Sequence, residues 1–209
     1  MAREAVLVAR LTNNRAPGAF ELEVAGGPLE GTHVLSIAAP YARNLFARIA
    51  GVIALTGLDI LAAEAVTTGF GPALQTFTVH PATGADAGPH TWAKLERSLG
   101  AALMDRFSLR VRLAERRRHY RPGRTGTLEA DITTDPFAAV LKIQAPDRVG
   151  LLYDVARAID DAGLHIASVT ATTRDDVALD TFRLVDADGA APVDMGLLGK
   201  LKMHLREIG

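Results

Sequence analysis

Hydrophobic and polar positions follow one order of elements in the C-terminal half of the chain. The apolar run at 139–143 predicts a strand, and apolar residues at helical spacing over 151–159 predict a helix. Alternating positions at 166–173 and 178–185 predict two more strands that form a hairpin. A last predicted helix carries four apolar residues on one face: Leu198, Leu201, Leu205 and Ile208. This order needs one more strand to close a ferredoxin-like sheet.

The N-terminal half repeats this order. Strands are predicted at 34–40, 60–67 and 74–79, and helices at 45–54 and 92–103. Identical residues recur without a gap, so that Ile37, Ala39, Pro40, Leu45, Ala50, Ile53, Gly57, Leu58, Ile60, Ala65 and Thr67 match Ile143, Ala145, Pro146, Leu151, Ala156, Ile159, Gly163, Leu164, Ile166, Ala171 and Thr173. Self-similarity of this kind indicates a duplicated fold. We therefore predict an α+β protein with two ferredoxin-like (βαββαβ) domains in tandem, at 31–106 and 137–209.

Residues 1–30 form a lead-in that we expect to be rich in strands. Two stretches alternate, Val6–Leu11 and Phe20–Val24, and the dipeptides Asn13-Asn14 and Pro17-Gly18 between them favour turns. A hairpin this small buries little surface alone, so we expect it to pack on the first domain. The end of a domain from a longer protein is the alternative interpretation.

Residues 107–136 form a basic linker between the two domains. Its cations and ring side chains are Arg110, Arg112, Arg116, Arg117, Arg118, His119, Tyr120, Arg121 and Arg124. Runs of like charge usually face water, so we interpret the stretch as a solvated helix end followed by a linker. An RNA contact is the weaker alternative, because Tyr120 alone could stack on bases. The alternating stretch at 128–132 predicts an edge strand.

The turn between strand and helix in the second copy is the first candidate for chemistry. Asp147 is a good N-cap residue, and Gly150 allows close approach to the backbone. Amides at a helix N-terminus also attract a small anion such as a carboxylate. A well-capped helix start without a ligand is the alternative. In the first copy Tyr41–Asn44 stands at the same place, without the acid, and Asn44 replaces the glycine but tolerates unusual backbone angles.

Composition narrows the chemistry further. The net charge is −1 and there is no cysteine, which excludes disulfides and thiolate catalysis. No phosphate-binding glycine motif occurs, and the six histidines are scattered, so we expect no cofactor, no metal and no catalytic centre. We expect the acid pairs Asp160-Asp161 and Asp175-Asp176 to face solvent. Without a signal peptide or an apolar run of membrane-spanning length, the sequence favours a cytoplasmic protein without membrane contact.

The chain resembles the ACT domain, a small module that senses amino acids. The resemblance lies in four segments: Asp147-Arg148-x-Gly150-Leu151-Leu152, Ala162-Gly163-Leu164-x-Ile166, Thr172-Thr173-Arg174 and Asp180-Thr181-Phe182. The tandem layout is similar to the C-terminal regulatory region of the bifunctional uridylyltransferase/uridylyl-removing enzymes that modify nitrogen regulatory protein PII. That resemblance covers roughly residues 31–209. It implies a non-catalytic part, because no His-Asp dipeptide of a hydrolase occurs here.

In that family two ACT domains bind glutamine and switch the enzyme between its two activities. The resemblance therefore implies glutamine as the favoured ligand, and catalytic domains of a longer enzyme and a PII-type protein as partners. Whether the chain is a fragment or a stand-alone sensor stays open, as does the alternative of a structural module with a degenerate site that forms a homodimer through its sheets. The candidate ligand-binding residues are Asp147, Arg148, Val149, Gly150 and Leu151, with Tyr41, Arg43, Asn44 and Leu45 in the first copy, and Ile60 and Ile166 on covering strands.

Overall fold

The computed structural model describes residues 2–13, 18–67, 72–82, 87–119, 126–192 and 194–208. The first copy contains β1 (Glu21–Gly26), β2 (His33–Pro40), α2 (Leu45–Thr56), β3 (Leu58–Thr67), β4 (Pro72–Pro81) and α3 (Pro89–Leu103). The second contains β5 (Glu129–Thr134), β6 (Ala139–Pro146), α5 (Leu151–Asp161), β7 (His165–Arg174), β8 (Val177–Val185) and α6 (Met195–Arg206). Two further helices are α1 (Ala2–Asn13) and α4 (Leu109–Arg117).

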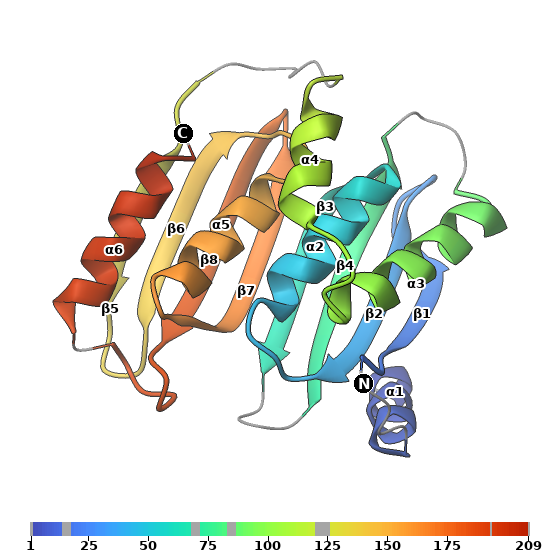
Figure 1. Ribbon diagram of the computed structural model, residues 1–209, viewed down its shortest axis with the longest axis horizontal. Coiled ribbons are helices and arrows are strands. Elements are labelled where there is room, and N and C mark those ends of the chain that lie inside the picture. The colour runs from blue at the N-terminus through green and yellow to red at the C-terminus, as the bar shows by residue number, and fades with distance from the viewer. Residues whose placement is uncertain are drawn as a thin grey trace.

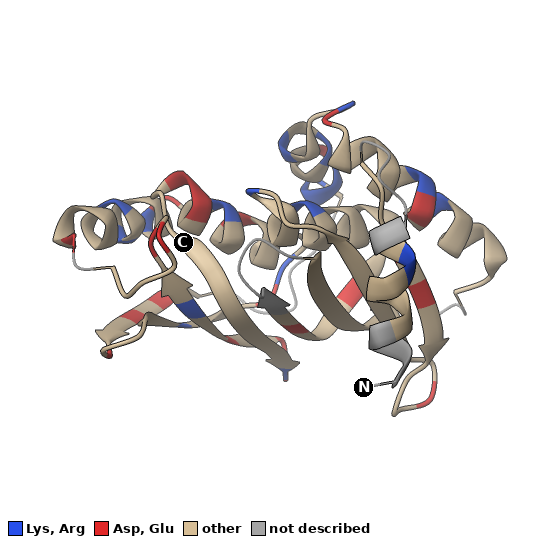
Figure 2. Ribbon diagram, turned by 90° about the horizontal axis from the view of Figure 1, so that it is seen from below, with Lys and Arg blue, Asp and Glu red and all other residues tan. Residues whose placement is uncertain are grey.

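The eight strands in the described part of the chain form one sheet in the order β1-β2-β4-β3-β7-β8-β6-β5 (Figure 1). Every neighbouring pair is antiparallel, including β3 and β7, which join the two copies. Helices α2, α3, α5 and α6 lie on one face of the sheet (Figures 1 and 2). The two copies therefore form a side-by-side pair within a single chain.

The predicted duplication is confirmed. Ile37 lies on β2 and Ile143 on the corresponding strand β6, and both are buried beneath the helices. The α+β, ferredoxin-like fold class is confirmed as well, but the position of the completing strand differs from the βαββαβ order. The fourth strand of each copy, β1 or β5, precedes the first strand of the motif instead of following its last helix. The predicted edge strand at 128–132 corresponds to β5.

The prediction of a strand at Val6–Leu11 is wrong, because this segment belongs to helix α1. A short apolar run fits both periods, and here the helical one prevails. Leu7 and Leu11, one turn apart, are buried against Ala38, whereas Val6 is half exposed. Since Ala38 alternates with core residues of β2, α1 covers the opposite face of the sheet from the other helices. Asn14 and Pro17 of the predicted turns lie outside the described residues.

Helix α4 changes the interpretation of the basic linker. Leu109 and Leu113 are buried in the main core, so this part of residues 107–136 packs against the protein and is not simply a solvated helix end. In Figure 1, α4 lies across the ends of α2 and α5. Tyr120, Arg121 and Arg124 lie outside the described residues. Among the described helices, none combines the length and the apolar character needed to cross a membrane.

Candidate functional site

The shape of the turn before α5 is set by its backbone. The amide of Asp147 donates to the carbonyl of Asp176, 2.8 Å away, which ties the turn to the β7–β8 hairpin. Gly150 is the N-cap residue of α5, in the left-handed conformation with φ 73° and ψ 19°. The expected capping role of Asp147 is therefore wrong, because the chain needs three more residues to reach the helix. The Asp147 carboxyl group instead faces a pocket.

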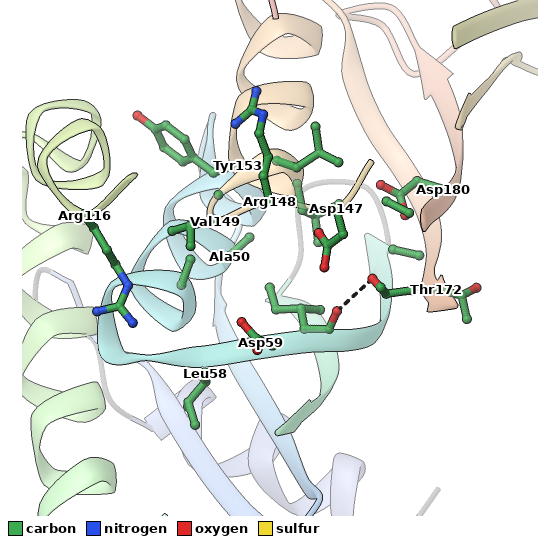
Figure 3. Close-up of a pocket in the computed structure, with 18 residues that line it drawn as sticks. Ala50, Leu58, Asp59, Arg116, Asp147, Arg148, Val149, Tyr153, Thr172 and Asp180 are labelled. Carbon is green, nitrogen blue, oxygen red and sulfur yellow. Dashed lines mark hydrogen bonds between the residues drawn. The ribbon is translucent and has the colours of Figure 1, made fainter. Parts of the chain in front are cut away.

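This pocket lies between the turn of the second copy and strand β3 of the first (Figure 3). Its volume is about 50 Å³. The structure brings six of the predicted site residues together in its wall: Asp147, Arg148, Val149, Gly150, Leu151 and Ile60. The hydroxyl of Thr173 on β7 donates to the carbonyl of Ile60 at 3.4 Å, so the two copies are also bonded at the pocket.

Three carboxyl groups face the pocket, and Figure 3 shows Asp147 between Asp59 and Asp180. Burial, together with the charge of the neighbouring Asp147, raises the pKa of Asp180 to about 7. Burial is the main cause that raises the pKa of Asp147 to about 6. The hydrogen bond from the Arg148 N–H lowers this pKa, and the charge of Asp59 raises it. The pKa of Asp59 is raised by burial too, although His80 and Arg116 oppose the shift. Such a cluster favours a cation between the carboxyls.

Other groups in the lining of this pocket favour an anion. The first-turn amides of a helix lack acceptors within the helix, and those of α5 begin at this pocket. The side chain of Arg116, from α4, also lines the wall and forms no ion pair within the described residues. Arg148 lines it as well, but its guanidinium donates to Asp154 at 2.8 Å and to the carbonyl of Ile208 at 3.3 Å.

Arg117 on α4 holds this turn in place. Its Nε donates to the carbonyl of Val149 at 2.8 Å, and its Nη2 donates to that of Gly150 at 3.2 Å. The same guanidinium forms an ion pair with Asp154, 2.8 Å away. Lys and Arg lie chiefly in the helical layer, interspersed with Asp and Glu (Figure 2). Arg117 is thus a structural part of the site, and sequence reasoning assigned it to a solvated surface instead.

A smaller cavity, about 20 Å³, lies at the equivalent place in the first copy. Tyr41, Asn44, Leu45 and Ile166 of the predicted residues line it, together with Asp160. Arg43 lies beside it, and its guanidinium donates to the backbone carbonyl of Asp160 at 3.1 Å. Each cavity therefore combines the turn of one copy with a strand of the other.

The two cavities differ in the groups that face them. In the internal repeat, Tyr41 is the counterpart of Asp147, and His165 is the counterpart of Asp59. The Tyr41 hydroxyl and His165 Nδ1 lie 2.7 Å apart and share a hydrogen bond. Gln75 takes the place of Asp180 after the one-residue slip in the repeat. Tyr41, His165 and Gln75 thus stand where the larger pocket has its three acids, and of these Tyr41 and His165 bond to each other.

Sequence reasoning missed several residues that line these cavities. Asp59 and Arg116 could be found only through the pairing of β3 with β7 and the packing of α4. The expectation that Asp160 faces solvent is wrong, because its side chain is buried and burial raises its pKa to about 6. Asp175 and Asp176 do lie on an exposed turn. No group of His, Cys, Asp or Glu within the described residues is arranged to hold a metal ion.

Known proteins are similar to this chain over most of its length. It is 30% identical to the bifunctional uridylyltransferase/uridylyl-removing enzyme of Gluconobacter oxydans over 185 residues, which is 85% of this chain and 20% of that protein. The chain resembles part of that enzyme. It is also 31% identical to the enzyme of the same name from Phenylobacterium zucineum over 211 aligned positions, 97% of this chain and 22% of that protein. The chain thus spans about a fifth of the length of these relatives.

Family models and solved structures give no stronger likeness than these relatives. No family model matches the sequence. Among solved structures, aspartate kinase from Synechocystis superposes with a TM-score of 0.44 and 13% identity, over 84% of this chain and 26% of the kinase. The strand order and register described above define the fold independently of that likeness.

Proposed function

We propose that this chain is a regulatory module that binds a free amino acid, with glutamine as its ligand, in the pocket between Asp147 and β3. The observation that carries the proposal is the opposition of charges in this pocket. Asp59, Asp147 and Asp180 favour an ammonium group, while the N-terminus of α5 and Arg116 favour a carboxylate. An α-amino acid carries both groups on one carbon.

Glutamine fits better than glutamate for an electrostatic reason. The three carboxyls of the pocket repel a second negative charge on the ligand. A side-chain amide can donate as well as accept, whereas a carboxylate only accepts, so acidic walls discriminate in favour of the amide. A site that pairs an amide rejects an analogue without the donor, because its own acceptor is then left unpaired.

The relatives indicate where such a module would act. We propose that it corresponds to a regulatory segment of a uridylyltransferase/uridylyl-removing enzyme, whose catalytic domains and a PII-type protein would be its partners. In this scheme the amino acid binds between the two copies, and a shift at their junction carries the signal. A cytoplasmic location, without membrane or nucleic-acid contact, goes with this proposal.

The second candidate is a structural module whose pockets bind nothing. The observation that favours it is the smaller cavity, where Tyr41 and His165 bond to each other instead of facing a ligand. In this alternative the edge strands β1 and β5 would be available for a homodimer through the sheets.

Calorimetric titration of the 209-residue chain separates the two candidates. We expect saturable binding of glutamine, weaker binding of glutamate, and at least a tenfold loss of glutamine affinity, about 1.4 kcal/mol, in Asp147→Asn. Asp188→Asn, on an exposed turn, is the matched control and should bind as the wild type does. No binding of either amino acid at millimolar concentration would establish the structural module instead, and equal affinities for glutamine and glutamate would overturn glutamine as the preferred ligand.

A further inference from the structure

We infer that the carboxylate of Asp160 is a built-in occupant of the smaller cavity, and that it marks where the ligand's carboxylate binds in the larger one. The first part rests on the geometry of the smaller cavity alone. The second part rests on the proposed amino-acid binding.

Asp160 lies on α5 of the second copy, yet its side chain lines the cavity at the start of α2 in the first copy. The residue is only 6% exposed. The backbone N–H of Asn44 interacts with its carboxylate, and the charge of Arg43 lies close by; both oppose the effect of burial on its pKa. A helix N-terminus, a free amide and a guanidinium are the groups that bind a carboxylate ligand. Here the Asp160 carboxylate lies at the Asn44 N–H, and the nearby Arg43 guanidinium donates to the backbone carbonyl of the same residue.

The internal repeat shows what changes in the larger pocket. The counterpart of Asn44 is Gly150, and both are N-cap residues in the left-handed conformation, with φ 60° and φ 73°. The counterpart of Asp160 is Ala54, which lines the larger pocket. The two helix starts therefore have the same geometry, but a methyl group stands in the larger pocket where the smaller one has a carboxylate. That difference leaves the anion position beside Gly150 free for a ligand.

The same correspondence orients the ligand. Burial and the charge of the nearby Asp160 carboxyl both raise the pKa of the Tyr41 hydroxyl, so these two groups lie near each other. Asp147, the counterpart of Tyr41, should then lie beside the ligand's carboxylate. In an α-amino acid the ammonium group is two bonds from the carboxylate carbon, so this pose brings it to Asp147. One bound amino acid per chain follows, since the other position is already filled.

Acetate tests the internal occupant without any amino acid. In Asp160→Ala, acetate should raise the melting temperature in a saturable manner, while equal sodium chloride should not. Asp160→Asn keeps the space filled, so it and the wild type should show no acetate effect. The absence of an acetate effect in a folded Asp160→Ala protein would overturn the inference. Should that variant not fold, the Asn44 amide resonance decides: it should titrate with pH in the wild type and not in Asp160→Asn, and an unchanged titration would overturn the inference.

Ala54→Asp tests the ligand position. A carboxylate placed beside Gly150 should lower glutamine affinity at least tenfold, whereas Ala54→Ser, without the charge, should retain most of it. Glutamine binding to Ala54→Asp at wild-type affinity would overturn this part. If the wild type binds no amino acid, the proposed function fails, and the acetate and resonance measurements still test the occupant separately.

Discussion

Glu64 and Thr170 lie directly opposite each other in the antiparallel pairing of β3 and β7, and each is the counterpart of the other in the internal repeat. The flanking pairs, Ala62 with Thr172 and Val66 with Ser168, exchange in the same way. The two copies are therefore related by a local twofold axis that passes through this pair. Because of this symmetry, each turn meets the strand of the other copy, and both cavities depend on one strand pairing.

The strand pairing at this axis tolerates little extra volume. Ala63 and Ala171 are opposite each other in the register, and both are buried under the helices. Ala63→Leu should lower the free energy of unfolding by about 1–3 kcal/mol, because a packed core yields only at the cost of shifted side chains and backbone. Denaturation in urea measures the loss. Ala130→Leu, at an exposed position of β5, is the control and should stay within about 0.5 kcal/mol of the wild type. A fully tolerated Ala63→Leu would show that the junction is loosely packed.

Periodicity predicted the repeated elements because two copies of one pattern support each other. It failed at Val6–Leu11, where a single short run fits a helix as well as a strand. The role of Asp147 was misread because sequence does not show that Gly150, three residues later, adopts the left-handed angle that begins the helix. A good capping residue is only one way to start a helix.

The pockets themselves could be predicted only in part. The turn residues Asp147–Leu151 follow from local pattern, and they do line the larger pocket. Asp59 and Asp160 come from the other copy in each case, so their place depends on long-range pairing that local sequence does not specify. The repeat contained a usable signal, since Asp160 is an acid at the position where the other copy has Ala54, one residue after the shared Ile53 and Ile159.

Gly150 is required by its backbone conformation and by its neighbour. A left-handed residue other than glycine costs roughly 1–2 kcal/mol, and a Cβ here would lie 2.8 Å from Arg117 Nη2. Gly150→Ala should therefore lower the free energy of unfolding by at least about 1 kcal/mol and weaken glutamine binding. Gly100→Ala, within α3, has room for its methyl group and should stabilise by about 0.5–1 kcal/mol. Thermal denaturation of both variants checks the contrast, and equal stability of the two would contradict it.

Arg117 couples α4 to the binding turn through three contacts, two to backbone carbonyls and one to Asp154. Lysine keeps the charge but lacks the planar fork, so Arg117→Lys should lose most of these contacts. We expect a loss of about 1–2 kcal/mol in unfolding free energy and faster hydrogen exchange at Val149 and Gly150. Arg157→Lys is the control, because its pair with Asp161 spans one helical turn at the surface and contributes about 0.3–0.5 kcal/mol. Unchanged exchange at the turn in Arg117→Lys would remove this coupling.

The buried acids make stability depend on pH in a defined direction. Burial raises the pKa of Asp180 from 3.8 to about 7, and those of Asp147 and Asp160 to about 6. Between pH 4 and these values the folded state holds protons that the unfolded state has released. The stability of the ligand-free protein should therefore fall as pH rises through this window, by about 1.4 kcal/mol per pH unit for each carboxyl that titrates. His165 acts in the opposite direction, since burial lowers its pKa.

A comparison of variants isolates the carboxyl contribution, because His165 is common to them. Asp180→Asn should flatten the slope of stability against pH between pH 5 and 7, and Asp188→Asn should leave the slope as in the wild type. An ammonium ligand favours the ionised carboxyls, so glutamine binding should release protons and grow tighter as pH rises over the same window. Calorimetry in two buffers of different ionisation enthalpy measures the protons released. If glutamine binding releases none near pH 6.5, its ammonium group does not lie against these carboxyls.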